Sequence, residues 1–175
     1  MDDRGERFEA LFTIHYPAVL RYCARRVPEG HADDAASSAF AIAWRKLDDV
    51  PRNDPLPWLL AVARRVVANQ ARAHRRRLAL GERLRARLPP AAAPADDGEA
   101  VRAALRRLRR ADAEVLMLVH WEGLTAVQAA QVLGASPAAV RQRLHRARER
   151  LAAELDPPHA RRSEAAVPEL EGSVG

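Results

Sequence analysis

The sequence predicts an all-α protein of two small helical domains joined by a flexible Pro/Ala-rich linker, with a helix-turn-helix in the second domain. Apolar residues recur at spacings of three and four through most of the 175-residue chain, which is the period of an amphipathic helix. The segment LPPAAAPADDG at 88–98 interrupts that pattern with low-complexity sequence typical of linkers. Residues 123–155 contain two helical patterns around a Gly-containing turn.

These patterns define the domain boundaries that we predict. The first domain covers residues 1–80, the linker 81–98, the second domain 99–156 and a disordered tail 157–175. The tail is polar and short of large apolar residues, so it has too little apolar surface to fold alone. A linker stretched as polyproline, at ~3.1 Å per residue, spans roughly 55 Å. A tether of that length lets the two domains engage sites that lie well apart.

Two apolar patterns open the first domain, at 8–12 and 19–27. Because proline lacks the N–H that a helix interior needs, we expect Pro17 to separate them into two helices. Pro28 ends the second pattern. Residues 31–50 then give an amphipathic helix with an acidic first turn, which suits the positive end of a helix dipole.

The segment PRNDPLP at 51–57 holds three prolines within seven residues, which predicts a loop. Arg52, Asn53 and Asp54 lie in it. A stiff loop of this kind is able to present polar groups to an unstacked base, but it is equally able to serve only as a connector. The residues alone leave both interpretations open, and the connector is the simpler one.

A long helix is predicted over 58–77, and it changes from apolar to basic along its length. Its middle carries arginine and amide side chains, and its end is the basic run HRRR at 74–77. Basic residues are favourable at any helix C-terminus, so this run alone indicates nothing specific. Beside a second DNA-reading element, it is typical of a track for phosphates.

The second domain carries the clearest local signals. Thr125 and Gln128 have the spacing of a capping box, and Gly134 stands where a helix ends in a left-handed residue. Ser136 is a second N-cap, followed by Pro137 at the first helical position, where its missing N–H costs nothing. Two short helices with a tight turn between them form the helix-turn-helix pattern, whose second helix enters the DNA major groove.

The second of these helices has one apolar and one basic side. Its apolar stripe is Val140, Leu144, Ala147, Leu151 and Leu155. Its basic side has Arg141, His145 and Arg148 on one line, with Arg143, Arg146 and Arg150 beside them. The arginines are suited to forked contacts with guanine, and Gln142 to pairing with adenine. The alternative is an ordinary helical hairpin with a solvated arginine face.

Composition limits the function classes. A formal net charge of +6 and a pI near 10.7 favour a polyanionic partner, although charge alone does not choose between nucleic acid and an acidic membrane. The single Cys23 excludes an internal disulfide and a Cys-rich zinc site. The six histidines are scattered without a close pair, so we expect no metal site, no cofactor and no small-molecule substrate.

Neither a membrane protein nor an enzyme is favoured. No apolar run approaches the ~20 residues that span a bilayer, and the acidic start MDDRGERFEA is unlike a signal peptide. We therefore expect a cytoplasmic protein. A DNA-processing enzyme such as a recombinase needs a nucleophile beside a catalytic cluster. Ser37, Ser38 and Tyr22 lie in core-type patterns without such partners, so no catalytic residue is predicted.

Three segments together resemble the extracytoplasmic-function (ECF) type of bacterial sigma factor. The sequence DDAASSAFAIAWRKL at 33–47 is similar to the family's polymerase-binding helix, and PWLLAVARRVVANQARAHRRR at 57–77 to its −10 element helix. Residues 114–151 are similar to its −35 reading domain, and their ending VRQRLHRARERL is the most specific match. The resemblance covers nearly everything from Phe8 to Leu155.

The resemblance implies roles for individual residues. The polymerase-binding positions are Asp33, Asp34, Phe40, Trp44 and Arg45. The −10 positions are Asn53 and Asp54, in a loop that captures a flipped base, and Trp58, Arg64, Arg65, Asn69, Arg72 and Arg76 along the helix. The −35 positions are Ser136, Arg141, Gln142, Arg143, His145 and Arg146.

The implied partners are core RNA polymerase, through its β′ clamp and β flap, promoter DNA and an anti-sigma factor. Ser37 and Ser38 depart from the family, which commonly has a Gln followed by an acidic residue there. If that change abolished polymerase binding, the alternative function would be a stand-alone helix-turn-helix transcriptional regulator.

Overall fold

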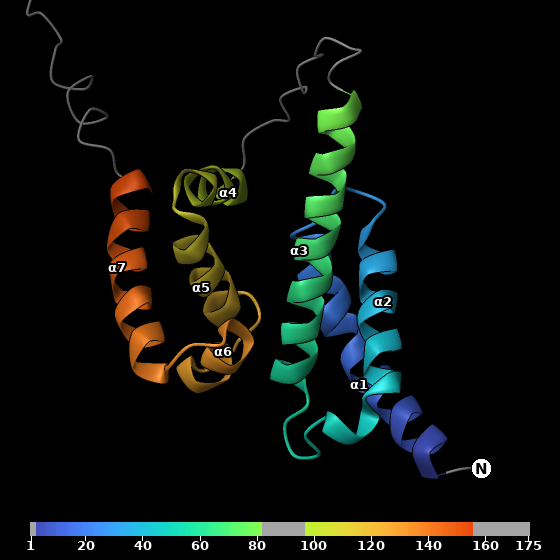
Figure 1. The fold of residues 1–175 in the computed structure, drawn as a ribbon. Coiled ribbons are helices and arrows are strands. Elements are labelled where there is room, and N and C mark those ends of the chain that lie inside the picture. The colour runs from blue at the N-terminus through green and yellow to red at the C-terminus, as the bar shows by residue number, and fades with distance from the viewer. Residues whose placement is uncertain (1–2, 82–96, 156–175) are drawn as a thin grey trace, which may run out of the picture.

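The structure is a computed structural model that describes residues 3–81 and 97–155, and all its regular elements in these ranges are helices (Figure 1). They are α1 (Asp3–Ala24), α2 (Ala32–Arg45), the 3-10 helix η1 (Leu47–Asp49), α3 (Leu56–Gly81), α4 (Asp97–Arg107), α5 (Arg110–His120), α6 (Ala126–Leu133) and α7 (Pro137–Leu155). The all-α prediction is confirmed. The predicted tail and most of the predicted linker, 82–96, lie outside the described residues.

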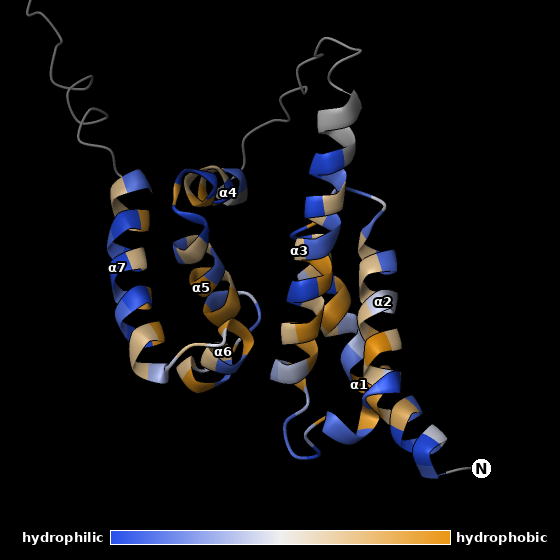
Figure 2. Cartoon of the chain, viewed as in Figure 1, coloured by the Kyte–Doolittle hydropathy of each residue, from blue (hydrophilic) through white to orange (hydrophobic). Residues whose placement is uncertain are grey.

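Helices α1, α2 and α3 pack together as the first domain (Figure 1). Their apolar faces turn inward, as the hydropathy colouring shows (Figure 2), and bury Val19, Tyr22, Phe40, Leu59 and Leu60. An aromatic cluster extends this core toward the surface; its members are Phe8, Phe12, Tyr16, Phe40 and Trp44.

Two prolines behave differently from the sequence-based expectation. Pro17 does not separate two helices, because it lies inside the 22-residue α1. Leu11 on one side and Val19 on the other are both buried in the same core, so a single continuous helix keeps both contacts at the cost of one hydrogen bond. Pro57 belongs to the first turn of α3 rather than to the loop, where its missing N–H would have no partner anyway.

The second domain consists of α4 to α7. Helix α5 packs along α7, and α6 closes one end of the pair (Figure 1). Val115, Leu118, Val132, Val140 and Leu144 are buried between them. These side chains form an apolar floor under the helix-turn-helix.

The two domains also contact each other, chiefly through α3 and α6 (Figure 1). The sequence gives no signal for this contact and favours two halves that engage separated sites. At this contact α6 lies against α3, and the start of α5 lies near the end of α1. The residues that pair there come from distant parts of the chain, so a local pattern does not indicate them.

Candidate nucleic-acid interface

The helix-turn-helix is held by local hydrogen bonds that confirm the predicted caps. The Thr125 hydroxyl accepts a hydrogen bond from the Gln128 backbone N–H at 3.2 Å, and the Gln128 side-chain oxygen accepts one from the Thr125 N–H at 2.9 Å. Gly134 ends α6 at φ +64°, in the left-handed region. The Ser136 hydroxyl accepts from the Ala139 N–H at 3.2 Å and starts α7. These bonds fix the angle at which α7 leaves the turn.

One side of α7 is buried and the other side is open to solvent. Val140, Leu144 and Ala147 are buried in the domain core. The predicted −35 residues Arg141, Gln142, His145 and Arg146 are exposed together on the N-terminal half of the helix, as is Ser136 at its start. Arg143 differs, because it is half-buried and lines a cavity between the two domains.

Two other arginines on α7 are engaged within the second domain. Arg150 forms an ion pair with Asp112 of α5, whose side chain is largely buried. Arg148 lies 3.3 Å from the His120 ring nitrogen. Their contacts hold α7 against α5, so the cationic side chains left for a ligand are concentrated near the α7 N-terminus. There the helix dipole also favours an anion.

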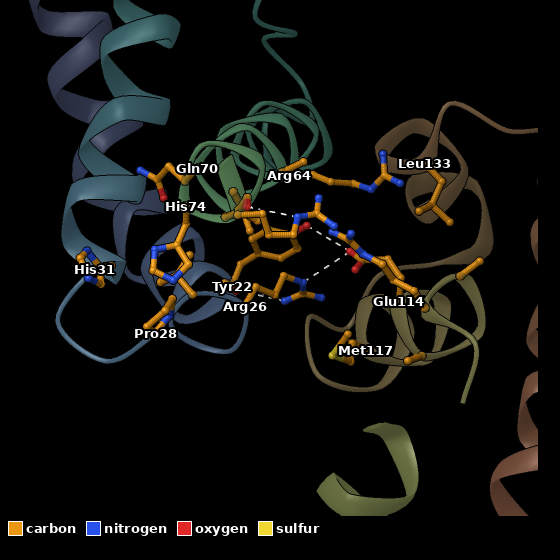
Figure 3. Close-up of a pocket in the computed structure, with 18 of the residues that line it drawn as sticks. Tyr22, Arg26, Pro28, His31, Arg64, Gln70, His74, Glu114, Met117 and Leu133 are labelled. Carbon is orange, nitrogen blue, oxygen red and sulfur yellow. Dashed lines mark hydrogen bonds and ion pairs between the residues drawn. The ribbon is translucent and has the colours of Figure 1, made fainter. Parts of the chain in front are cut away.

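Helix α3 presents its polar side chains in two different directions. The exposed residues Arg65, Asn69, Arg72 and Arg76 recur at spacings of four, three and four, so they form one stripe along the helix. Within it, the Arg72 guanidinium donates a hydrogen bond to the Asn69 side-chain oxygen. Arg64 is about a quarter turn away and faces the interdomain cavity (Figure 3). The structure therefore brings together four of the predicted −10 residues and separates Arg64 from them.

The loop before α3 is exposed at Asn53 and Asp54, next to the half-buried Trp58. The Gln128 side-chain amide, at the start of α6, donates a hydrogen bond to Asp54 at 2.9 Å. Burial lowers the pKa of His15 on α1, while the negative charge of Asp54 opposes that shift. The loop therefore lies where α1, α3 and α6 meet.

The predicted polymerase-binding residues on α2 occupy different environments. Asp34 and Arg45 are exposed, while Phe40 is only 2% exposed and so acts as support. Trp44 is 41% exposed and packs edge-on against Phe8 at 5.1 Å between ring centroids. Asp33 accepts a hydrogen bond from the Tyr16 hydroxyl, which raises the Tyr16 pKa.

Helix α2 thus offers an open polar surface with an aromatic edge. Its exposed positions Asp34, Ser37, Ser38, Ala41 and Arg45 follow one another at helical spacing on a single face. Trp44 lies beside that face, with the Arg4 guanidinium 5.1 Å from its ring centroid.

Sequence reasoning missed a cluster of charged residues at the domain contact. The Tyr22 hydroxyl donates to Glu114 Oε1 at 3.1 Å, and Arg26 Nη1 donates to Glu122 Oε1 at 3.0 Å (Figure 3 shows Tyr22, Arg26 and Glu114). Arg25 Nη1 donates to Glu122 Oε2 at 3.0 Å. We name Tyr22, Arg25, Arg26, Glu114 and Glu122 the interdomain latch. Its hydrogen-bonded partners are more than 90 residues apart in the chain, so no local pattern indicates it.

A cavity of about 1210 Å³ lies beside the interdomain latch (Figure 3). Helix α3 contributes Arg64, Val67 and His74 to its wall, and the second domain contributes Arg143 and Leu133. Burial and the neighbouring Glu114 raise the pKa of Tyr22 above its ordinary value, so its hydroxyl stays protonated and able to donate.

Other site types receive no support from the described ranges. Within residues 3–81 and 97–155, no three His, Cys, Asp or Glu side chains come together as metal ligands would. Among the helices of these same ranges, none combines the length and apolar character needed to cross a membrane.

Family models match both domains. The model described as "Sigma-70 region 2" matches residues 11–77, and "Sigma-70, region 4" matches residues 98–151. The first match covers α3 and the loop before it, and the second covers the helix-turn-helix.

Curated relatives include sigma factors from several bacteria. The chain is 31% identical over 156 residues to RNA polymerase sigma factor CarQ of Myxococcus xanthus, covering 86% of this chain and 90% of CarQ. It is 30% identical over 169 residues to ECF RNA polymerase sigma factor SigC of Mycobacterium tuberculosis, covering 87% and 85%. A probable sigma factor RfaY of Xanthomonas campestris is 36% identical over 135 residues, 71% of this chain, but the chain spans only 34% of that protein.

Solved structures of similar fold include two sigma factors in complex with other proteins. CnrH in complex with the cytosolic domain of CnrY aligns with a TM-score of 0.61 and 27% identity, covering 86% of this chain and 88% of that one. RpoE in complex with the anti-sigma factor NepR, from Bartonella quintana, aligns with a TM-score of 0.68, covering 86% and 98%. The second pair is 22% identical, which supports the fold alone.

Proposed function

Because the chain belongs to the ECF group of the sigma-70 family, we propose that it binds core RNA polymerase and directs transcription initiation from specific promoters. It reads a −35 element through the second domain, and it melts and holds a −10 element through the first. The observation that carries the proposal is that one chain has two exposed polar surfaces. One is the patch at the N-terminal half of α7, and the other is the stripe along α3.

Reading the −35 element requires side chains that reach base edges in the major groove. Arg141 and Gln142 are exposed in the first turns of α7. A guanidinium matches the two acceptors of guanine, and a side-chain amide matches adenine. Arg146 and His145 lie one turn further along, and Ser136 stands at the helix N-terminus, where a backbone phosphate is favourable. This patch therefore reads duplex sequence.

Opening the −10 element requires tighter binding to a single strand than to the duplex. The stripe from Arg65 to Arg76 runs about 16 Å along α3, at ~1.5 Å per residue. It supplies cations for the strand's phosphates. Asn53 and Asp54, in the exposed loop at the start of the helix, supply acceptors and donors for a base that leaves the stack, and Trp58 supports that loop.

Two surfaces fit the polymerase. The exposed face of α2 from Asp34 to Arg45, edged by Trp44, docks on the β′ clamp. An apolar cavity of about 360 Å³ between α4, α5 and α7, lined by Leu105, Trp121 and Leu151 among others, receives a helix of the β flap. Since the polymerase works in the cytoplasm, so does this chain.

The role is one of binding and regulation, without a reaction of its own. The structures of CnrH with CnrY and of RpoE with NepR are complexes of sigma factors with other proteins. From the family, and from the likeness at 27% identity to CnrH in complex with the cytosolic domain of CnrY, we infer that an anti-sigma factor binds the present chain. A stand-alone regulator is not favoured, because such a protein has no need for the region 2 domain matched at 11–77.

A transcription assay tests the proposal. Purified chain is mixed with core RNA polymerase and templates in which the −35 and −10 boxes are randomised, and run-off transcripts are sequenced. We expect co-elution with core and enrichment of one promoter, called the selected promoter below. Co-elution without transcripts would refute promoter specificity, and no co-elution would favour the stand-alone regulator. Core alone is the control.

A further inference from the structure

Beside the packing of α3 against α6, the contact between the domains contains a group of buried charges. In the interdomain latch, the side chains of Arg26 and Glu122 are 7% and 6% exposed, and that of Glu114 is 12% exposed. Arg25 adds a second guanidinium to Glu122, and it also lies over the Trp121 ring at 5.4 Å. Both carboxylates come from the second domain, and both guanidinium groups come from the turn after α1.

Such an interface is specific but not strongly stabilising. Removing ions from water costs free energy that their mutual attraction repays only when every hydrogen bond is made. Here Arg26 Nε and Nη2 are buried without a hydrogen-bond partner among the residues that the structure describes, although Nε lies 3.4 Å from Glu114 Oε1 as an ion-pair contact. The latch therefore selects one arrangement of the domains and still leaves it easy to open.

We call the packing of the two domains against each other the closed arrangement. In it, residues assigned above to promoter binding take part in contacts between the domains. Asp54, in the loop proposed to capture a base, is hydrogen-bonded to Gln128 of the helix-turn-helix. Arg64 and Arg143, one from each domain, line the same interdomain cavity. In contrast, Arg141 and Arg146 stay exposed. The closed arrangement therefore hinders −10 binding by the first domain and simultaneous binding by both domains. It hinders −35 binding by the second domain less.

Dimensions lead to the same conclusion. Boxes centred near −35 and −10 are roughly 25 base pairs apart, or about 85 Å along B-form DNA at ~3.4 Å per pair. A compact body of about 140 residues has a radius of gyration near 14 Å and is therefore roughly 37 Å across. The closed arrangement cannot reach both boxes at once.

We propose that the closed arrangement is an autoinhibited state held by the interdomain latch, and that binding of a two-element promoter requires the latch to open. This rests on the proposed function. When only a fraction of molecules is open, the apparent affinity falls by that fraction. A chain that is open about once in a hundred molecules therefore binds such a promoter about a hundredfold more weakly than a fully open chain.

The first test removes the two negative charges of the latch and compares the result with removal of two negative charges elsewhere on the protein. The variant Glu114→Gln/Glu122→Gln is compared with Glu9→Gln/Glu29→Gln, two exposed acidic residues outside the latch. Two probes made from the selected promoter are a fork with a duplex −35 box and a single-stranded −10 box, and the −35 duplex alone. We expect the latch variant to bind the fork about 10- to 100-fold more tightly than the control variant does. On the −35 duplex, the two variants should differ less than twofold.

Equal gains for both variants on the fork would overturn the proposal, because charge alone would then explain them. The domain distance gives an independent reading in the DNA-free chain. Spin labels on Thr13→Cys and Ala153→Cys, both at exposed positions, should report one short distance in the parent chain and a broad, longer distribution in the latch variant. A broad distribution already present in the parent chain would also overturn the proposal.

The second test locks the latch in its closed form. Its outcomes distinguish a failure of the latch proposal from a failure of the proposed function. Arg25→Cys/Glu122→Cys is joined by a bis-maleimide with a cleavable disulfide, since the parent side chains meet at 3.0 Å. We expect the locked chain to give at least tenfold fewer run-off transcripts with core, and reduction of the linker to restore them. Full transcription by the locked chain overturns the latch but leaves the sigma function intact. No transcription even after cleavage, and none by the parent chain, overturns both.

Discussion

Helices α3 and α7 carry the same chemistry, arginine with a few amides, yet their surroundings give it different uses. In α7 the exposed cations are gathered near a capped N-terminus, because Arg148 and Arg150 are engaged with α5. In α3 they form a stripe from Arg65 to Arg76 along a helix whose other face belongs to the core. A compact patch suits reading a few bases, whereas a stripe suits following a backbone.

The largest expected effect is the loss of stability when a buried side chain of α3 is shortened. Leu59 is 0% exposed, so Leu59→Ala should lower the free energy of unfolding by about 2–5 kcal/mol, through lost apolar burial and a cavity. Chemical denaturation measures this. Leu155→Ala, at a position on α7 that is 45% exposed, is the control and should change stability by less than about 1 kcal/mol. Similar losses at both positions would contradict the assignment of α3 as a core helix.

Base reading by α7 is tested by Arg141→Ala. Loss of a forked contact with a base should weaken binding to the selected −35 duplex by about 1–3 kcal/mol, and weaken binding to unrelated duplex much less. Fluorescence anisotropy on both duplexes gives the two values. Arg21→Ala, which removes the same charge from an exposed position on α1, should change both only slightly. Equal losses on the two duplexes would make Arg141 a phosphate contact.

The cap of α6 should have a measurable but smaller effect. Thr125→Ala removes the side-chain acceptor for the Gln128 N–H and should lower stability by about 1 kcal/mol. Thermal unfolding measures the change, with Thr13→Ala, on the exposed surface of α1, as the control. An unchanged unfolding midpoint would mean that packing under α6, rather than its cap, fixes the turn.

The smallest expected effect belongs to the end of the α3 stripe. Arg76→Ala should weaken binding to all single-stranded DNA by a similar factor. It should also make the slope of log K against log salt shallower by about 0.7, as the loss of one phosphate contact on a single strand does. Titrations at four salt concentrations measure the slope. An unchanged slope would remove Arg76 from the phosphate track and shorten the stripe.

The helix-turn-helix was readable from the sequence because its determinants are local. Thr125, Gln128, Gly134 and Ser136 act on backbone groups within a few residues of themselves. The α3 stripe has the same origin, since a spacing of four, three and four places residues on one line of any helix. The expected helix break at Pro17 was wrong for the converse reason, because burial of Leu11 and Val19 in one core outweighs a local preference.

The all-α class, the turn and caps of α6 and α7, and the alignment of polar residues along α3 and α7 follow from the order of residues alone, since each depends on neighbours in the chain. The tertiary structure alone decided which arginines remain available and how the domains meet. Arg26 and Glu122 are 96 residues apart, and nothing near either residue specifies the other. Only the packing of α6 against α3 brings the end of α1 and the end of α5 close enough for this contact, and by our proposal that packing decides whether the two surfaces proposed for DNA act together.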